Sequence, residues 1–325
     1  MNFKITPDDA GMRLDAFLAA GIEGWSRSRL QKLIDDEEVL VNGKKSKSSY
    51  KLSEGDEIEV ELAEPEAESF EPENIPLEIV YEDEFLAVIN KPAGLVVHPG
   101  AGVPSGTLAN AIAWHFGFRT SDPGSNQKEI PNPKSQIPNR INRVGIVHRL
   151  DKDTSGLIVV AKNERTHETL AKQFRDREVF KSYVALVHGA VRGAKGKIDA
   201  PVGRDRYNRL KMTVAKTGRH ALSIWRTRRT FEKFTLLDVE IKTGRTHQIR
   251  VHLASINHPV VGDALYNEGR DNTVNDPQVR RAIAGLNRFF LHSERLSFRH
   301  PVSKEKMNFQ SPLPKELNAL LGLLG

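Results

Sequence analysis

The chain has 325 residues, of which 38% are hydrophobic and 28% charged, with a net charge of +6 at pH 7. This length suits two domains, and no stretch approaches the roughly 20 apolar residues of a membrane-spanning helix. The N-terminus lacks a signal-peptide pattern, and the absence of cysteine excludes disulfides, iron–sulfur clusters and thiolate zinc sites. We therefore expect a soluble cytoplasmic protein that does not contact a membrane.

The charge is unevenly distributed along the chain. Between Leu52 and Asn90 there are 14 acidic residues and no Lys or Arg, whereas the chain after Asn90 carries a net charge of +19. Such an excess suits a polyanion such as nucleic acid. A solvated basic surface without a partner has the same composition, so composition alone leaves both interpretations open.

The first 62 residues predict a small module that starts with two helices. Residues 13–20 have apolar side chains at helical spacing, and Gly21 follows as a stop signal. Ser26 is the expected cap of a second helix over 27–35, which has one apolar face.

A hairpin completes this module. A short strand at 39–41 is followed by the turn pair Asn42-Gly43, a basic run and a second strand at 57–62. Residues 63–75 are acidic and contain proline, which predicts a semi-rigid linker. The remaining residues, 76–325, are expected to form the second domain.

The second domain mixes strands and helices. Strands are expected at 78–81, 85–90, 157–161, 183–187, 223–225 and 235–241, and helices from Thr107, over 165–175 and over 246–255. Residues 119–143 predict a long polar loop, which is usually functional or disordered. Helices interspersed among antiparallel strands favour the α+β class, with a mixed, largely antiparallel sheet.

The densest group of reactive side chains is HRLDKDTSGL, residues 148–157, directly before an apolar strand. A polar loop above a rigid strand is a frequent place for catalysis. Asp151 and Asp153 would share a face in an extended backbone and diverge in a turn. A helix cap or a structural Asp–Arg bridge is the competing interpretation.

A second candidate is TGRTHQIRVHL, residues 243–253, at a strand-to-helix junction. Arg245 and Arg250 have the geometry to bind phosphate or to hold a carboxylate bidentately. His247 and His252 are five apart, which differs from the i, i+4 spacing of zinc-binding helices, so we expect no metal. A packed helix with solvated arginines is the alternative.

Two further segments are weaker candidates. Tyr183 follows Lys181 into an apolar strand, where a tyrosine is more often part of the core than catalytic. Residues 90–102 form a glycine-rich loop that permits close approach of a ligand to the backbone. This loop lacks a Walker sequence, so we expect no nucleotide cofactor.

Together these segments resemble one family, the bacterial large-subunit rRNA pseudouridine synthases of the RluA/RluD type. The resemblance runs through NKPAGLVVHPG at 90–100, HRLDKDTSGL at 148–157, KSY at 181–183, TGRTHQIRVH at 243–252 and HPVVGDALY at 258–266. The first 62 residues resemble the RNA-binding domain named after ribosomal protein S4, with WSRSR at 25–29 and VLVNG at 39–43. The presence of that domain makes the chain more similar to the RluD branch of the family.

The resemblance implies the roles of single residues. Asp151 matches the essential aspartate of the family, Arg250 the arginine that pairs with it, and Tyr183 the tyrosine that packs against the target base and takes part in proton abstraction. The residues expected to bind RNA are His148, Arg149, Arg245, Arg27, Arg29, Lys32 and Lys44.

The implied reaction is the isomerisation of specific uridines in 23S rRNA, in the subunit-interface stem-loop that RluD-type enzymes modify. It requires no cofactor or metal, because the base is detached and rejoined without redox chemistry. The expected partner is 23S rRNA or a pre-50S particle, and the expected state is a monomer. A non-catalytic ribosome-assembly factor and a nucleoside or glycoside hydrolase remain as alternatives.

Overall fold

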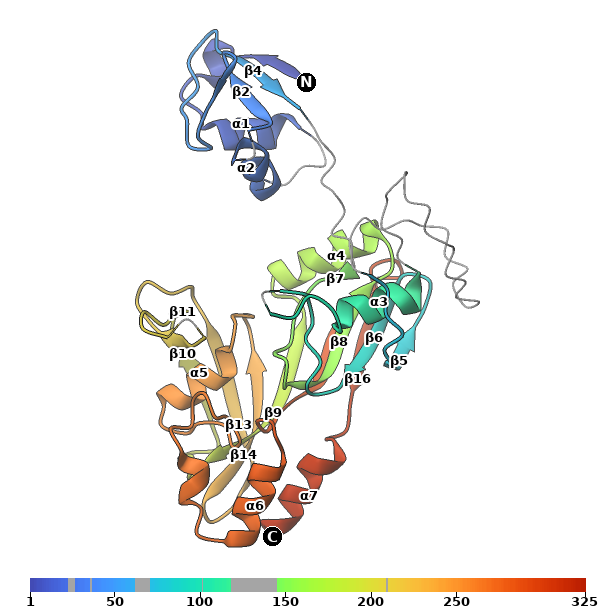
Figure 1. The fold of residues 1–325 in the computed structure, drawn as a ribbon, viewed down its shortest axis with the longest axis vertical. Helices are drawn as coiled ribbons and strands as arrows, with labels where there is room; N and C mark the ends of the chain where they lie inside the picture. Colours follow the sequence, from blue (N-terminus) through green and yellow to red (C-terminus); the bar gives the residue numbers. More distant parts are fainter. Residues whose placement is uncertain (23–26, 36, 62–70, 101, 118–144, 209) are drawn as a thin grey trace. The chain divides into compact units, whose positions relative to one another are not determined.

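The computed structural model describes residues 1–22, 27–35, 37–61, 71–100, 102–117, 145–208 and 210–325, with only the backbone for 27–29 and 32. They form two compact units, Met1–Glu66 and Ala67–Gly325 (Figure 1). The expected cap Ser26 and the polar loop at 119–143 lie outside the described residues. None of the helices in the described part of the chain is long and apolar enough to span a membrane.

The smaller unit combines helices with a four-stranded sheet. Its elements are β1 (Asn2–Lys4), the 3-10 helix η1 (Pro7–Asp9), α1 (Leu14–Gly21), α2 (Arg27–Asp35), β2 (Val39–Val41), β3 (Lys44–Lys45) and β4 (Glu57–Val60), with strand order β1-β4-β2-β3. Positive φ angles at Asn42 and Gly43, 52° and 69°, make the predicted tight hairpin turn. The predicted helices and hairpin are confirmed, but Gly21 lies within α1 and β1 was not predicted.

The larger unit contains a ten-stranded sheet. Its strands are β5 (Glu78–Glu82), β6 (Leu86–Lys91), β7 (Gly145–Ile146), β8 (Ser155–Ala161), β9 (Phe180–His188), β10 (Lys195–Asp199), β13 (Leu222–Thr230), β14 (Phe234–Ile241), β15 (Leu291–Arg299) and β16 (Lys306–Gln310). The order is β10-β13-β14-β9-β15-β8-β6-β5, with β16 on β15 and β7 on β8. Among the strands that the structure describes, only β15 and β8 pair in parallel, which confirms the α+β prediction.

The helices pack against this sheet and against each other. They are α3 (Leu108–Phe116), α4 (Glu164–Arg175), α5 (Gln248–Ser255), the 3-10 helix η2 (Arg270–Thr273), α6 (Pro277–Gly285) and α7 (Lys315–Leu323). Helix α4 contacts β7 and β8, and α5 contacts β13 and the hairpin of β11 (Val202–Arg204) and β12 (Met212–Val214) (Figure 1). Helices α3, α4 and α5 were predicted, whereas α6, α7 and six strands of this unit were not.

Part of the predicted linker belongs to the larger unit. The Asn110 side-chain amide of α3 donates to the Glu71 carbonyl at 2.9 Å, and the Gly106 amide donates to the Glu73 carboxylate at 2.8 Å. His115 Nε2 donates to the Ile75 carbonyl at 2.9 Å. These bonds hold residues 71–75 against α3, so the linker interpretation is wrong for that part of 63–75.

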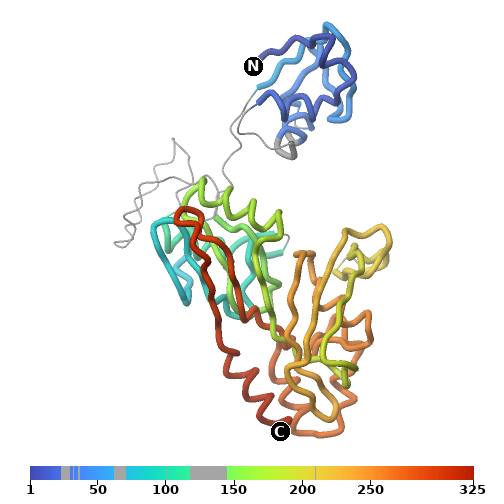
Figure 2. Tube along the Cα trace, turned by 180° about the vertical axis from the view of Figure 1, so that it is seen from behind, coloured from blue at the N-terminus to red at the C-terminus, as the bar shows by residue number. Residues whose placement is uncertain are grey.

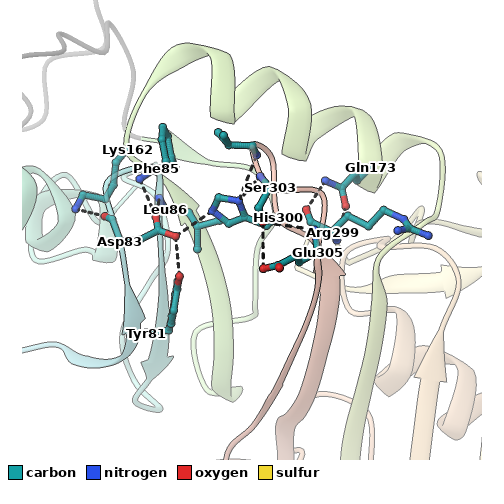
Figure 3. Close-up of polar contacts among 11 residues, drawn as sticks. Tyr81, Asp83, Phe85, Leu86, Lys162, Gln173, Arg299, His300, Ser303 and Glu305 are labelled. Carbon is teal, nitrogen blue, oxygen red and sulfur yellow. Dashed lines mark hydrogen bonds and ion pairs between the residues drawn. The ribbon is translucent and has the colours of Figure 1, made fainter.

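The hairpin of β15 and β16 is held beside β5 and β6, as the tube view and a close-up show (Figures 2 and 3). Asp83 Oδ2 accepts bonds from Tyr81 Oη at 2.8 Å and from His300 Nε2 at 2.9 Å. The other ring nitrogen of His300 accepts the Ser303 amide at 3.0 Å. This network fixes the far end of β15, the central strand that borders the site described next.

Candidate active site

One cavity of about 390 Å³ lies where the segment before β8, helix α4, strand β9 and the β14–α5 junction meet. Its volume is in the lower part of the range of roughly 300–1,000 Å³ found for small-molecule sites. The lining residues described by the structure include five cations and a single carboxylate, that of Asp151. The cations are Arg149, Arg175, Lys181, Arg245 and Arg250.

Asp151 lies in a tight turn immediately before β8. The Thr154 amide donates to the Asp151 carbonyl at 3.1 Å, so residues 151–154 form a turn rather than an extended strand. Asp151 lines the cavity, and its side chain is 18% exposed. The rigid, fully buried strand β8 therefore presents one carboxylate to the cavity.

Arg250 of α5 joins Asp151 to a buried anchor. Its Nη1 donates to Asp151 Oδ2 at 3.2 Å, while Nε and Nη2 form a bidentate pair with Asp263 at 2.6 and 2.9 Å. The guanidinium carbon lies 4.2 Å from the Phe289 ring centroid and 5.0 Å from that of Tyr266. Burial lowers the pKa of Arg250, but the bonds and charges of Asp263 and Asp151 outweigh it and raise the pKa.

Arg250 is 6% exposed, and α5 is buried from Gln248 to Leu253. The alternative of a packed helix with solvated arginines is therefore wrong for Arg250. Asp263 was not identified from the sequence as part of the site, although it lies in the HPVVGDALY segment. The guanidinium is fixed on two sides, so it orients the Asp151 carboxylate and supplies a permanent positive charge beside it.

Tyr183 lies in the middle of β9, paired with Val239 of β14 and Ser293 of β15. It lines the cavity and is 5% exposed. Burial raises the pKa of Tyr183, the hydrogen bond with Ser293 opposes this, and the negative charge of Asp151 raises the pKa further. The phenol therefore keeps its proton throughout the neutral range.

Lys91, at the end of β6, clamps the backbone next to Asp151. It is fully buried, and its Nζ donates to the carbonyls of Pro92 and Leu95 at 2.8 Å and of Lys152 at 2.9 Å. Burial lowers the pKa of Lys91 to about 7, while the three carbonyls match the three N–H bonds of the ammonium form. No role was predicted for Lys91, since a lysine at the end of a strand has no local sign of burial.

Comparison with known proteins connects this geometry to a reaction. Residues 85–255 match the family model described as RNA pseudouridylate synthase, and residues 12–58 match the S4 domain. The chain belongs to the RNA pseudouridylate synthase family. Members of this family convert uridine in RNA to pseudouridine, which confirms the predicted enzyme class and the predicted S4-like module.

This synthase aligns with its relatives over nearly its whole length. It is 40% identical to the uncharacterized RNA pseudouridine synthase YlyB of Bacillus subtilis, over 95% of this chain and 93% of the relative. It is 43% identical to ribosomal large subunit pseudouridine synthase D of Nitrosomonas europaea, over 97% and 85%.

Among solved structures, human RNA pseudouridylate synthase domain containing 4 matches with a TM-score of 0.57 and 23% identity, over 76% of this chain and 92% of that one. This likeness supports the fold alone.

The residues predicted to bind RNA fall into three places. Arg149 is exposed and Arg245 half-buried at the cavity, where Arg245 Nε also donates to the His220 carbonyl at 3.1 Å. Lys44 is exposed on β3 of the smaller unit. Arg27, Arg29 and Lys32 belong to α2, and their side chains lie outside the described residues.

His148 faces inward instead. Its Nε2 accepts the Val159 amide of β8 at 3.0 Å, and its ring stacks on Phe174 of α4 with centroids 4.5 Å apart. Burial, together with the positive charge of Lys181, lowers the pKa of His148 to about 3. A neutral ring with an occupied nitrogen is a poor phosphate ligand, so His148 packs in the wall of the cavity, and its RNA contact stays a prediction.

Proposed function

We propose that this synthase isomerises specific uridines of 23S ribosomal RNA, with Asp151 acting at C1′ of the target ribose. The observation that carries the proposal is the lone carboxylate in the cavity, held by Arg250 at 3.2 Å. Glycoside hydrolysis ordinarily needs two carboxylates, one of them to protonate the leaving group. Uracil leaves as a delocalised anion, so one ionised carboxylate is sufficient here.

The target nucleotide has to leave its stack to reach Asp151, at a cost of a few kcal/mol. Arg149, exposed at the cavity, is placed to hold the flanking backbone or to fill the vacated space. Tyr183 packs against the inserted base. Because the Tyr183 phenol is protonated, it accepts the C5 proton only if it passes its own proton to another group at the same time.

The relatives support the choice of RNA. Those from Nitrosomonas europaea and Xanthomonas campestris are named ribosomal large subunit pseudouridine synthase D, the latter at 40% identity over 98% of this chain and 91% of the relative. The S4 domain and the cations of the cavity fit the same substrate. We further propose that the synthase acts in the cytoplasm as a monomer, on 23S rRNA or a pre-50S particle, within the subunit-interface stem-loop.

Pseudouridine mapping tests the substrate. Total RNA from cells with and without the gene is treated with carbodiimide and read by primer extension. Loss of signals in one 23S rRNA stem-loop, restored by the wild-type gene but not by Asp151→Asn, is the expected result. A map unchanged in 23S rRNA but altered in tRNA would overturn the substrate while leaving the reaction intact.

A further inference from the structure

Lys181 is a buried cation that the mechanism above does not use. It lies two residues before Tyr183 in β9, so the two side chains emerge on the same side of the strand. It is 9% exposed and lines the same cavity as Asp151. Its Nζ lies 5.3 Å from the centroid of the Phe174 ring of α4.

Lys181 differs from the other buried cations in the part of the chain that the structure describes. Lys162 pairs with Glu82, Arg250 with Asp263 and Arg288 with Glu316, and Lys91 donates to three carbonyls. The Lys181 ammonium has no such acceptor among the described residues, and burial alone lowers its pKa to about 8. A cation on a largely buried side chain without a counter-charge is costly, so the site is suited to an anion that a ligand brings into the cavity.

The depth of Lys181 indicates which part of an RNA reaches it. Arg149 and Arg175 are exposed at the cavity, where a phosphodiester chain has to enter and leave. These two exposed arginines are therefore positioned to bind phosphate groups of the RNA backbone. A buried ammonium is reached instead by the group inserted into the cavity, which is the flipped base.

We propose that Lys181 binds a carbonyl oxygen of the inserted uracil and stabilises the negative charge of the detached base. This inference rests on the proposed function. When the N1–C1′ bond breaks, its electron pair stays with the base and spreads over N1, O2 and O4, while Asp151 acts at C1′. The base then turns, C5 bonds to C1′, the C5 proton is lost and N1 gains a proton. Lys181 keeps its proton throughout.

Single-turnover kinetics and RNA affinity test this role separately. The probe is a 23S rRNA transcript labelled with tritium at uridine C5, with tritium release as the rate and fluorescence anisotropy as the affinity. Lys181→Met has nearly the same shape without the charge. Removing one preorganised donor for a developing anion costs on the order of 100–1,000-fold in rate. We expect a loss of that size at saturating enzyme, with the dissociation constant within threefold.

Three matched variants complete the test. Lys181→Arg keeps the positive charge and is expected to react at least tenfold faster than Lys181→Met. A role of Lys181 in packing alone would not explain that recovery. Arg175→Met removes a rim cation and is expected to weaken RNA binding by a larger factor than it lowers the saturated rate. Lys233→Met, in an exposed turn, makes the same chemical change elsewhere and is expected to change neither quantity.

The outcomes separate this inference from the proposed function. If Lys181→Met matches wild type in the saturated rate, or loses only affinity, the contact with the departing base is wrong. If the wild-type enzyme releases no tritium and forms no pseudouridine on any 23S transcript, the proposed function itself fails.

Discussion

Arg250 donates from Nη1 to the carboxylate of Asp151 at 3.2 Å, although 99 positions separate the two residues in the chain. The same guanidinium is held bidentately by Asp263, which is 1% exposed. Asp151 is thus positioned through a buried ion-pair network and not by its own loop alone. The pair of Arg250 and Asp263 therefore contributes both to the stability of the larger unit and to the orientation of the Asp151 carboxylate.

Replacing Arg250 by Met is expected to lower the free energy of unfolding by about 3–5 kcal/mol, because it leaves the Asp263 carboxylate buried without a counter-ion. It also leaves Asp151 without its orienting partner, so activity is lost. Urea denaturation and tritium release measure the two effects. The double variant Arg250→Met with Asp263→Asn is expected to regain part of the stability but no activity. Recovered activity in the double variant would show that Arg250 serves stability only.

Tyr183→Phe is expected to bind RNA as wild type does and to form product at least about 100-fold more slowly, the scale of a lost proton-transfer group. The apolar ring still fills the cavity wall, so the fold is retained. Anisotropy and single-turnover tritium release are the measurements. Normal turnover would limit Tyr183 to packing against the base.

His148 makes the larger unit sensitive to acid. Its pKa is about 3 in the folded chain and near 6.5 when unfolded, so below pH 6.5 the unfolded state binds more protons. Between pH 6.5 and 5 this lowers the free energy of unfolding by about 2 kcal/mol. His148→Gln keeps an acceptor for the Val159 amide and does not titrate. Its Tm is therefore expected to fall less than that of wild type from pH 7 to pH 5; equal falls would assign the acid sensitivity to other groups.

Deleting residues 1–62 is expected to leave the larger unit folded, because that unit has its own hydrophobic core. The S4 domain would be lost, and with it part of the affinity and selectivity for 23S rRNA. Circular dichroism and competition between 23S rRNA and tRNA transcripts check the two parts. An unfolded truncation would show that the units depend on each other.

Local patterns predicted much of the fold, since helix α2 has apolar residues at helical spacing, β2 and β8 are short apolar runs, and β14 alternates apolar and acidic residues. Strand β15 was missed because His292, Ser293 and Glu294 read as exposed, whereas their polar atoms are paired inside the protein. Helix α6 did carry a signal that was overlooked, since Asp276 caps it and Pro277 occupies its first turn.

The candidate site likewise contains residues that a local pattern reveals and residues that only long-range contacts bring together. The motif containing Asp151 was recognisable in the sequence, because its reactive residues are adjacent in the chain. The roles of Asp263, Lys91 and Lys181 depend on contacts between distant segments, which no local pattern encodes. The inward packing of the His148 ring has a related cause, because the Phe174 ring and the Val159 amide that hold it are 26 and 11 positions away.

Direct analysis of the product RNA tests the central claim. Purified wild-type enzyme and Asp151→Asn are incubated with a 23S rRNA transcript, and the nucleosides are separated by liquid chromatography and mass spectrometry after digestion. Wild type is expected to convert uridine to pseudouridine without releasing uracil, and Asp151→Asn is expected to form none while binding the transcript within a few-fold. Pseudouridine formed by Asp151→Asn at more than a tenth of the wild-type rate would contradict the role of this carboxylate, and free uracil would contradict the isomerisation.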